Sequence, residues 1–483
     1  MKLKDLLQGV SVIETAADLE TEIASVTYDT RKQIVPGSLF VAISGASQEG
    51  NRFIPMAMEK GAVVVVTAKK PEKAVPYILV ESDRKALAQI GANYYGHPDR
   101  KMVMVGITGT NGKTSVTLIL KHILEVTLGA KVGLIGTTGN QIGGQMIPSE
   151  RTTPESLELQ KLFSQMVEAG CSHCIMEVSS HAIALDRVAG IHYDVAAFTN
   201  LTEDHLDFHR TMEAYCDTKA ELFRRCDRGV INRDDDWYSR IAEKATCSVL
   251  TTSAKEKAGL WAKDIRLFSN GVQFIAVAGE TEAKVVLPIP GRFSVYNGLT
   301  ALGTAMELGV PLRAAAAALA TASGVKGRVE VVPTPGKPYT VLIDYAHTPD
   351  GLENVLSSVK GFCKGRLIAV FGCGGDRDPM KRPIMGKIGV SLADHAIITS
   401  DNPRSEAPMA IIRDILSGVG EGSYEVIEDR RKAIRHAMDI GRKDDIIVLA
   451  GKGHETYQEI CGVKHHLDER EEVAAYLAEM RES

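Results

Sequence analysis

A glycine-rich turn between an apolar run and an amphipathic run is the feature that most constrains this chain. Residues 102–107 read Met-Val-Met-Val-Gly-Ile, residues 108–114 read Thr-Gly-Thr-Asn-Gly-Lys-Thr, and residues 115–126 carry apolar side chains at helical spacing. This order predicts a buried strand, a tight turn and a helix. Such a turn directs backbone N–H groups at phosphate oxygens, and the positive end of the helix dipole adds to the attraction. The stretch therefore predicts a site for nucleotide phosphates.

Two side chains of this turn suit phosphate chemistry. The ammonium group of Lys113 can reach the outer phosphates, and the hydroxyl group of Thr114 can bind Mg²⁺. One position departs from the strict phosphate-loop pattern, because Ile107 stands where a glycine is required and Gly106 lies one place earlier. A structural turn is the alternative, but it rarely needs Gly-Lys-Thr in this context, so we interpret the turn as an ATP site.

Composition restricts the class of protein. The 483 residues exceed one ordinary domain and are enough for about three. The hydrophobic fraction of 44% and the charged fraction of 24% are typical of a soluble globular protein, and a net charge of −5 does not favour nucleic-acid binding. The first residues lack the apolar core of a signal peptide, and no apolar run approaches the ~20 residues of a membrane span. Eight dilute cysteines fit reduced thiols, so we expect a cytoplasmic protein with no membrane or nucleic-acid partner.

Residues 1–98 predict a small α/β domain. Buried strands are expected at 38–43 and 62–66, with a helix at 53–60 between them. Polar loops at 29–31 and 44–51 follow or precede these strands, where ligands commonly bind. Proline and polar residues at 97–100 interrupt two apolar patterns and indicate a boundary there.

The middle region, residues 99–331, carries ionisable groups directly after predicted strands. Glu177 ends one apolar strand, and a carboxylate at that position beside a phosphate loop commonly binds Mg²⁺ or positions water. The strand at 195–198 runs into a segment that contains Asp204 and His205. Grouping charges there costs desolvation unless they have a function, although a solvated loop with a helix cap is the alternative.

Several residues of the middle region leave alternatives open. Lys219 lies on an apolar helix face, where a lysine either extends to solvent or is held in a site. Thr153 is expected to cap a helix that has Pro154 at its first position. Cys171 and Cys174 have the spacing of a metal or redox pair, but no second pair follows, so packed thiols are favoured.

From residue 332 the sequence repeats strand, loop and helix, which predicts a Rossmann-like doubly wound domain. Strands are expected at 340–343, 367–371, 395–399 and 445–449. The loops after parallel strands share one sheet edge, so Arg377, Arg404 and Glu455 would converge on one crevice. Two guanidinium groups and a carboxylate suit a zwitterion, with surface ion pairing as the alternative. The glycines at 372–375 do not match the dinucleotide pattern, which argues against NAD.

The order of these motifs resembles the Mur ligases over essentially the whole chain. The resemblance is carried by Gly109–Thr114, Glu177–His181, Thr199–Leu201 with Asp204–Asp207, Tyr215 with Lys219 and Leu222–Phe223, Asn297, Arg328 and Asp344–His347. The tetrapeptide Asp401-Asn402-Pro403-Arg404 is similar to the signature of the members that add meso-diaminopimelate. The lysine-adding members are similar elsewhere but typically lack its arginine.

The resemblance implies an α/β fold of three domains. These are a UDP-sugar-binding α/β domain at 1–98, a central P-loop ATPase domain with a mostly parallel sheet at 99–331, and a Rossmann-like amino-acid-binding domain at 332–483. It further implies that ATP phosphorylates the D-glutamyl γ-carboxylate of UDP-N-acetylmuramoyl-L-alanyl-D-glutamate, and that an amine of meso-diaminopimelate then attacks the acyl phosphate. A monomer would do this in cytoplasmic peptidoglycan precursor synthesis. The alternatives are a lysine-adding sister ligase, a folylpolyglutamate synthase, and a nucleotide-dependent sugar-nucleotide-binding module without ligase activity.

The resemblance also implies a role for each matching residue. The expected catalytic residues are Lys113, Glu177, His205 and Lys219, and the expected Mg²⁺ ligands are Thr114, Glu177 and His205. The expected ATP contacts are Gly109, Thr110, Asn111, Gly112, Lys113, Thr114, Asn297, Arg328, Asp344 and His347. The UDP-sugar dipeptide would contact Thr30, Ser47, Thr152, Thr153, Ser179, Arg187 and Lys219, the last of these as a carbamate (N6-carboxylysine). The amino acid would contact Arg377, Asp401, Asn402, Pro403, Arg404, Gly451 and Glu455.

Overall fold

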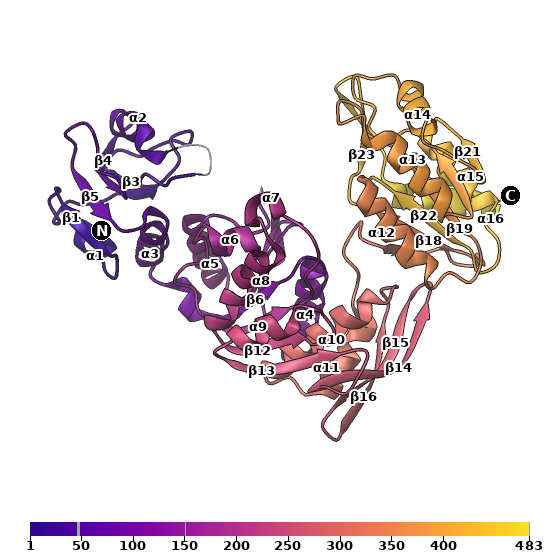
Figure 1. Cartoon of the computed structure of the whole chain (residues 1–483), viewed down its shortest axis with the longest axis horizontal. Helices are drawn as coiled ribbons and strands as arrows, with labels where there is room; N and C mark the ends of the chain where they lie inside the picture. The colour runs from indigo at the N-terminus through magenta and orange to yellow at the C-terminus, as the bar shows by residue number, and fades with distance from the viewer. Residues whose placement is uncertain (46–48, 150, 483) are drawn as a thin grey trace. The chain divides into compact units, whose positions relative to one another are not determined.

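The structure is a computed structural model that describes residues 1–45, 49–149 and 151–482 (Figure 1). The chain forms two compact units, one made of Met1–Trp261 with Leu299–Ala315 and the other of Ala262–Gly298 with Ala316–Ser483. Among the described residues, no helix has both the length and the apolar character needed to cross a membrane.

The N-terminal segment of the first unit folds around a five-stranded sheet with the order β1-β5-β4-β3-β2. Its elements are α1 (Leu3–Leu6), β1 (Val12–Thr15), β2 (Ser25–Thr27), β3 (Ser38–Val41), η1 (Gly50–Phe53), α2 (Ile54–Glu59), β4 (Ala62–Thr67), β5 (Tyr77–Val80), α3 (Asp83–Tyr95) and η2 (Pro98–Lys101). Strands β2 to β5 pair in parallel, and β1 pairs antiparallel with β5. Helix α3 is delimited by Ser82, whose hydroxyl accepts the Lys85 N–H, and by Gly96 in a left-handed conformation.

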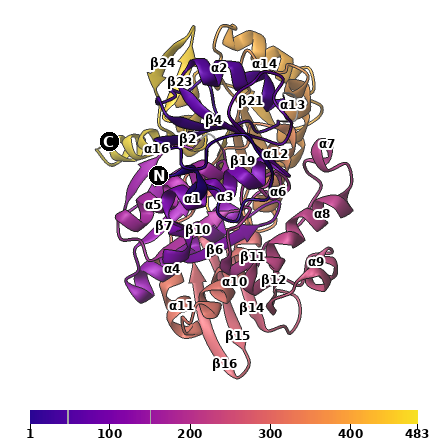
Figure 2. The same cartoon turned by 90° about the vertical axis from the view of Figure 1, so that its left-hand side faces the viewer.

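The phosphate-loop strand lies in the middle of a larger sheet. That sheet has the order β16-β15-β14-β13-β12-β11-β6-β10-β7-β8-β9, and Figure 2 shows β7, β10, β6, β11 and β12 following one another. The elements up to β13 are β6 (Val103–Thr108), α4 (Lys113–Leu128), β7 (Val132–Ile135), β8 (Asn140–Ile142), β9 (Gln145–Ile147), α5 (Ser156–Glu168), β10 (His173–Glu177), α6 (Ser180–Ala184), β11 (Tyr193–Phe198), α7 (Leu206–His209), α8 (Met212–Ala220), η3 (Glu221–Arg224), β12 (Cys226–Asn232), α9 (Tyr238–Lys244) and β13 (Ser248–Ser253). Strand β6 pairs in parallel with both β10 and β11. Strands covered on both faces read as continuous apolar runs, which explains why the sequence revealed them.

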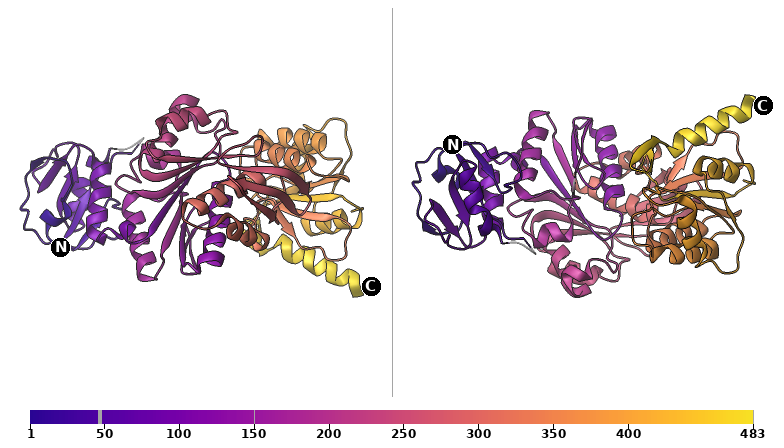
Figure 3. Two further views of the ribbon diagram at one scale, coloured as in Figure 1. Left: turned by 90° about the horizontal axis from the view of Figure 1, so that it is seen from below. Right: turned by 90° about the horizontal axis from the view of Figure 1, so that it is seen from above.

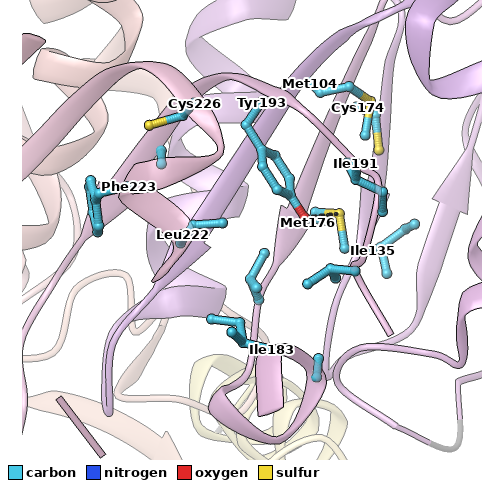
Figure 4. Close-up of a cluster of buried hydrophobic side chains, with 14 of the residues drawn as sticks. Met104, Ile135, Cys174, Met176, Ile183, Ile191, Tyr193, Leu222, Phe223 and Cys226 are labelled. Carbon is cyan, nitrogen blue, oxygen red and sulfur yellow. Dashed lines mark hydrogen bonds between the residues drawn. The ribbon is translucent and has the colours of Figure 1, made fainter. Parts of the chain in front are cut away.

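Gly106, which departs from the phosphate-loop pattern, has a packing role within β6. The ring of Tyr193 lies against it, and a Cβ atom added at Gly106 would come within 3.0 Å of two ring carbons. Tyr193 is fully buried, and its hydroxyl group donates to the sulfur of Met176 at 3.5 Å. Figure 4 shows this tyrosine among the buried side chains of the cluster, including Met104 and Cys174. A glycine at 106 therefore allows the close approach of the aromatic ring, which a larger residue would press against.

The chain then continues through strands that the sequence did not predict. They are β14 (Leu260–Phe268), β15 (Gly271–Ala278) and β16 (Thr281–Leu287), followed by α10 (Phe293–Glu307), α11 (Leu312–Ala318) and η4 (Leu319–Thr321). Strands β15 and β16 form an antiparallel hairpin that is polar on one face, so their alternating pattern is weaker than that of a buried parallel strand.

The C-terminal part of the second unit is a doubly wound domain with the strand order β17-β18-β22-β19-β20-β21. Its elements are β17 (Glu330–Val332), β18 (Thr340–Asp344), α12 (Pro349–Lys360), β19 (Leu367–Phe371), α13 (Lys381–Leu392), β20 (His395–Ile398), α14 (Pro408–Leu416), β21 (Tyr424–Val426), α15 (Arg430–Asp439), β22 (Ile446–Ala450), β23 (Tyr457–Ile460), β24 (Val463–His466) and α16 (Glu469–Glu482). Helices α12, α13 and α14 lie side by side on one face of the sheet (Figure 1). Helices α15 and α16, the latter at the yellow end of the chain in Figure 3, pack on the other.

Alternation along the strands builds the two cores of this domain. Leu342 of β18 and Val448 of β22 belong to the core under α12 and α13, whereas Ile343 and Leu449 belong to the core under α15. Both faces of this sheet are apolar, so each of its four predicted strands appears in the sequence as a continuous apolar run. The bounds of all four strands are confirmed to within one residue at either end. The short strand β21 and the hairpin of β23 and β24 were missed.

The predicted cap of α5 was wrong. The helix begins at Ser156, and the carboxylate of Glu155 accepts the N–H of that residue at 3.2 Å. The hydroxyl group of Thr153 instead donates to the carbonyl oxygen of Glu177 at 2.9 Å. Thr153 is therefore used in a long-range contact, which a local capping pattern does not reveal.

Candidate active site

The phosphate loop is held in shape by two glycines and by the segment after β11. Gly109 and Gly112 have φ values of 146° and 85°, and a Cβ atom at Gly109 would lie 1.9 Å from the hydroxyl oxygen of Thr199. The N–H of Thr110 donates to the carbonyl of Asn200 at 2.8 Å, and the amide oxygen of Asn200 accepts the next N–H of the loop at 2.9 Å. The loop is thus preorganised immediately before α4, where anions bind favourably.

Two lysines meet inside this loop. The ammonium group of Lys113 donates to the carbonyl oxygens of Gly109 and Thr110, both at 2.9 Å. Lys219 of α8 is 1% exposed, and its ammonium group also donates to the Gly109 carbonyl at 2.9 Å. Burial lowers the pKa of Lys113, and burial together with the charge of Lys113 lowers the pKa of Lys219 well below its ordinary value. The sequence left Lys219 open between solvent and a site, and the structure shows it buried with its ammonium group at the phosphate loop.

Glu177 lies at the carboxyl end of β10, fully buried. Its two carboxylate oxygens accept the N–H and the hydroxyl group of Thr137 at 3.0 and 3.1 Å. Gly136 leaves room for this carboxylate, because a Cβ atom there would lie 2.3 Å from one of its oxygens. Thr137 was not predicted, since nothing local distinguishes it from other loop threonines.

The predicted ligand His205 is exposed and lies next to other aromatic side chains. Its ring centroid lies 4.7 Å from that of His181 and its Nδ1 lies 3.4 Å from a carboxylate oxygen of Asp204. His209, which was not predicted as a site residue, hydrogen-bonds through Nε2 to the Ser180 hydroxyl at 2.9 Å. Burial, assisted by the neighbouring histidine and lysine, lowers the pKa of His209 to about 4. This imidazole is therefore neutral near pH 7.

The predicted Mg²⁺ ligands provide an incomplete set of donors. In the part of the chain that the structure describes, no group of three or more His, Cys, Asp or Glu side chains is arranged to hold a metal ion. Thr114 lies in the first turn of α4, and Glu177 is close enough to Lys113 to oppose the lowering of that lysine's pKa. A hydroxyl and a carboxylate suit Mg²⁺, which normally completes its shell with water and substrate phosphate oxygens. The residues therefore fit Mg²⁺ together with a bound nucleotide.

Several residues predicted to hold the sugar dipeptide meet beside Glu177. The hydroxyl oxygen of Thr153 accepts the Ser179 N–H at 3.1 Å, and the guanidinium group of Arg187 donates to the Thr153 carbonyl at 3.2 Å. The Thr152 and Thr137 hydroxyl groups are 3.0 Å apart. The structure thus brings Thr152, Thr153, Ser179 and Arg187 together around the end of β10.

A cavity of about 400 Å³ in the first unit adjoins this group. Its charged and phenolic lining consists of Tyr28, Asp29, Arg31, Lys32, Arg151, Glu155, Glu158 and Lys161. Glu155 is buried, and Arg84, Arg151 and Arg187 approach it at 3.2, 3.9 and 3.5 Å. Thr30 is buried next to two lining residues, and its carbonyl accepts the Lys60 ammonium at 2.7 Å. Ser47 lies outside the described residues.

A second cavity, of about 250 Å³, lies at the predicted edge of the doubly wound sheet. Its lining comes from the loops after β18, β19, β20 and β22 and consists of Tyr345, His347, Thr348, Gly374, Arg377, Lys381, Asp401, Asn402, Arg404, Gly451 and Glu455. All the residues predicted to hold the amino acid are among them except Pro403. The carboxyl ends of parallel strands meet at one edge, which is why strand order alone brought these residues together.

The backbone around Arg404 is unusual. Arg404 has a φ of 52°, its guanidinium group donates to the Gly375 carbonyl at 2.7 Å, and its Nε lies 3.4 Å from a carboxylate oxygen of Glu459. Residues of β23 hold this conformation, since the Arg404 N–H donates to the carbonyl of Glu459 at 3.0 Å. Gly451 has a φ of 119°, and a Cβ atom there would lie 2.5 Å from the Asp401 carboxylate. Glu459 was missed because its hairpin was missed.

The other predicted ATP contacts belong to the second unit. Asn297 is buried on α10, and the guanidinium carbon of Arg328 lies 5.6 Å from the centre of the Tyr345 ring. The Asp344 carboxylate accepts the N–H groups of Val329 and of Ala346, each at 2.8 Å. Burial raises the pKa of Asp344. His347, predicted with this group, lines the second cavity.

Cys171 and Cys174 are both buried and free, as the packed-thiol interpretation predicted. Among the described residues, neither cysteine belongs to a group of side chains that could hold a metal ion, and the two do not form a disulfide. Burial raises the pKa of the Cys174 thiol, which makes it a packed apolar group.

Three domain families match the chain in sequence order. The Mur ligase family catalytic domain matches residues 22–95, the Mur ligase middle domain matches 107–305, and the Mur ligase glutamate ligase domain matches 327–453. These three matches agree with the predicted three-domain α/β fold, which is confirmed.

Curated relatives match over their full length. UDP-N-acetylmuramoyl-L-alanyl-D-glutamate–2,6-diaminopimelate ligase 1 of Clostridium acetobutylicum is 47% identical over 483 residues, which cover 99% of this chain and 100% of that protein. The corresponding ligase of Caldanaerobacter subterraneus subsp. tengcongensis is 48% identical over 484 residues, with 99% of each chain covered.

Solved structures agree with these matches. One of a UDP-N-acetylmuramoyl-L-alanyl-D-glutamate–2,6-diaminopimelate ligase has a TM-score of 0.80 at 30% identity and covers 100% of both chains. The MurF ligase from Thermotoga maritima in complex with ADP shares the fold, with a TM-score of 0.60 at 19% identity and coverage of 96% of this chain and 98% of that one. The chain therefore belongs to the Mur ligase family.

Proposed function

We propose that this chain is an ATP-dependent ligase that joins meso-diaminopimelate to the D-glutamyl γ-carboxylate of UDP-N-acetylmuramoyl-L-alanyl-D-glutamate. The observation that carries the choice of amino acid is the second cavity, where Arg377, Arg404 and Glu455 face one small space. Guanidinium forks bind carboxylates and a carboxylate binds ammonium, so this lining suits an amino acid. Relatives over 40% identical along nearly the whole chain have this activity in their names.

The residues around the phosphate loop support an acyl-phosphate route. A carboxylate oxygen is a poor leaving group, so transfer of the ATP γ-phosphoryl group to it makes the carbonyl carbon reactive. The amine then attacks that carbon, and the tetrahedral intermediate expels phosphate to leave the amide. Lys113 and the N–H groups before α4 would offset the negative charge that develops on the transferring group.

The metal and the modified lysine are parts of the same proposal. Thr114, Glu177 and His205 would hold Mg²⁺, which supplies positive charge next to the phosphate oxygens. Lys219 would carry a carbamate, formed when its neutral amine attacks CO₂ and releases a proton. The pKa of Lys219 is lowered by burial and by Lys113, which favours the reactive neutral amine. A carbamate would also exchange a buried positive charge for a negative one beside Lys113.

The first cavity suits the sugar nucleotide. Its lining has four cations, Arg31, Lys32, Arg151 and Lys161, of which the first two pair with Asp29 and Glu158. These cations would bind a diphosphate, and the Tyr28 ring would contact a base. Thr152, Thr153, Ser179 and Arg187 would hold the muramoyl dipeptide next to Glu177. Asn297, Arg328, Asp344 and His347 remain the expected further contacts of ATP.

The remaining parts of the proposal concern organisation. We infer a UDP-sugar-binding domain at 1–98, a central ATP-binding domain at 99–331 and an amino-acid-binding domain at 332–483. We further infer a monomer that works in cytoplasmic peptidoglycan precursor synthesis. Size-exclusion chromatography with light scattering checks the monomer, since a dimer would double the mass from 52.2 kDa.

The test is an assay of phosphate release with ATP, Mg²⁺ and the muramoyl dipeptide, run separately with meso-diaminopimelate and L-lysine. A parallel assay supplies L-glutamate with a folate acceptor in place of the dipeptide. We expect release and a ligated product with meso-diaminopimelate alone. Equal rates with L-lysine would indicate the lysine-adding sister ligase. Glutamate addition to a folate acceptor would indicate a folylpolyglutamate synthase, and binding without release would indicate a non-enzymatic module.

A further inference from the structure

A lysine lies behind the second cavity without lining it. Lys452 follows the end of β22, its side chain has no exposed surface, and it does not belong to the cavity wall. Its ammonium nitrogen lies 3.1 Å from the amide oxygen of Asn402, 3.2 Å from a carboxylate oxygen of Glu455 and 3.6 Å from one of Asp401. All three of these partners do line the cavity.

The contacts of Lys452 fix which way the Asn402 amide points. The amide oxygen accepts from Lys452 and from the N–H of Glu459, the latter at 2.9 Å. Its NH₂ group is left to donate to Glu455, to the same carboxylate oxygen that Lys452 contacts, at 2.8 Å. Lys452, Asn402 and Glu455 thus form a closed set of three hydrogen bonds, in which each orientation depends on the other two.

Lys452 also places a positive charge next to two carboxylates of the lining. Asp401 and Glu455 both line the cavity of about 250 Å³, together with the cations Arg377, Lys381 and Arg404. The ammonium group of Lys452 reaches both carboxylates from a fully buried position outside the lining, whereas the cations of the lining are available to the substrate side of the cavity. A fully buried ammonium group costs desolvation, and an apolar side chain of similar length would avoid that cost. The arrangement therefore favours a role in binding over one in stability alone.

We propose that Lys452 is a positioning residue that orients the Glu455 carboxylate, directly and through Asn402, to receive an ammonium group of the incoming amino acid. It acts across two loops, since Asn402 follows β20 whereas Lys452 and Glu455 follow β22. The proposal rests on the proposed function, because it assigns the second cavity to the amino-acid substrate.

The test compares steady-state kinetics of the wild type with those of Lys452→Met, which keeps the length of the side chain and removes its charge. We expect the KM for meso-diaminopimelate to rise about tenfold or more, with the KM values for ATP and the muramoyl dipeptide within about twofold of the wild type. Lys452→Arg keeps the cation and should restore part of the affinity. Unchanged KM for meso-diaminopimelate in Lys452→Met would overturn the proposal.

A matched control separates positioning from general loss of stability. Asp445 is buried directly before β22, at the end of that strand opposite to Lys452. Arg366 pairs with it, with 2.7 Å between nitrogen and oxygen. Arg366→Met should lower the melting temperature as Lys452→Met does, without a selective change in the KM for the amino acid. A similar rise in that KM for Arg366→Met would also overturn the proposal, because it would show a merely structural effect.

A double-mutant cycle gives a second readout. If Lys452 acts through Glu455, then Lys452→Met should add little to the KM of Glu455→Gln, whereas independent roles would multiply the two effects. Should Lys452→Met fail to fold, Lys452→Gln serves in its place, because it keeps a hydrogen-bond donor without the charge. A wild-type protein that does not ligate meso-diaminopimelate would refute the proposed function itself, which is a different outcome.

Discussion

Lys113 and Lys219 donate hydrogen bonds to one and the same carbonyl oxygen, that of Gly109, each at 2.9 Å. Two ammonium groups held at one acceptor repel each other, and Lys219 is buried whereas Lys113 is half-buried. Burial is the larger cause of the lowered pKa of Lys219 and the charge of Lys113 adds to it, while the centre of the Tyr215 ring lies 4.6 Å from the ammonium nitrogen. The pKa of Lys219 is therefore the more strongly lowered, which makes its amine available for chemistry.

The first prediction concerns this amine. Lys219→Ala should lose ligation and regain part of it when millimolar formate or acetate is added, since a small carboxylate can occupy the place of the carbamate. Mass spectrometry of the wild type in bicarbonate buffer under native conditions should show an added CO₂. Full activity of Lys219→Ala without any added acid would remove Lys219 from the mechanism.

The second prediction concerns the phosphate loop. Lys113→Ala should lower the rate of ligation about 10³-fold, because the cation that offsets phosphoryl charge is lost. Circular dichroism should show an unchanged fold. Lys121→Ala is the control on the same helix, since Lys121 pairs with Glu125 away from the loop. Ligation by Lys113→Ala at close to the wild-type rate would contradict the assignment of this loop.

The third prediction concerns pH and His209. The pKa of His209 is about 4 in the folded protein and about 6.5 when unfolded, so between these values only the unfolded state binds the proton. Stability is therefore lost as the pH falls from about 6.5 to about 4, by roughly 1 to 3 kcal/mol. His209→Gln, which can still hydrogen-bond to Ser180, should flatten that part of the profile. Denaturant titrations at a series of pH values measure this, and an unchanged slope would exclude His209 as its source.

The fourth prediction concerns the choice of amino acid. Arg404→Lys keeps the charge and loses the planar fork, so activity with meso-diaminopimelate should fall about a hundredfold. Glu459→Gln removes the carboxylate beside Arg404 Nε and should cause a smaller loss of the same kind. Binding of the muramoyl dipeptide serves as the internal control, since neither change should affect it. Equal losses in the affinity for both substrates would argue against a selective role.

The fifth prediction concerns a close approach of two backbone segments. Gly327 has a φ of 74°, and a Cβ atom there would lie 2.4 Å from backbone atoms of Gly453 and His454. Gly327→Ala should destabilise the protein by about 2 to 4 kcal/mol and raise the KM for the amino acid, because the loop that carries Glu455 must move.

Gly336→Ala is the matched control for that variant. Gly336 has a similar φ of 81°, but no atom lies within 4 Å of an added Cβ, so this variant carries the backbone strain without the clash. Thermal unfolding of both variants separates the two effects. Equal melting temperatures for Gly327→Ala and Gly336→Ala would show that the contact with the 451–455 loop is unimportant.

The strands and the phosphate loop were predictable because their signals are local. Strands β6, β10 and β22 are buried on both faces, so their sequences are continuous apolar runs. A glycine-rich turn that ends in Gly-Lys-Thr before a helix is typical of a phosphate site. Strand order alone then brought Arg377, Arg404 and Glu455 to one edge. The hairpin of β15 and β16 and that of β23 and β24 were missed, since exposed strands alternate weakly and carry polar residues.

The sequence by itself determined the buried parallel strands, the phosphate loop and the residue types that a Mur ligase needs. Only the tertiary structure decided the partners of its polar groups. Thr153 binds the Glu177 carbonyl where a helix cap was expected, Lys219 reaches Gly109, and Lys452 holds Asn402 from behind the cavity. The physical reason is that a buried polar group needs a hydrogen-bond partner. In these cases the partner belongs to a loop far away in the sequence, which only the fold brings close.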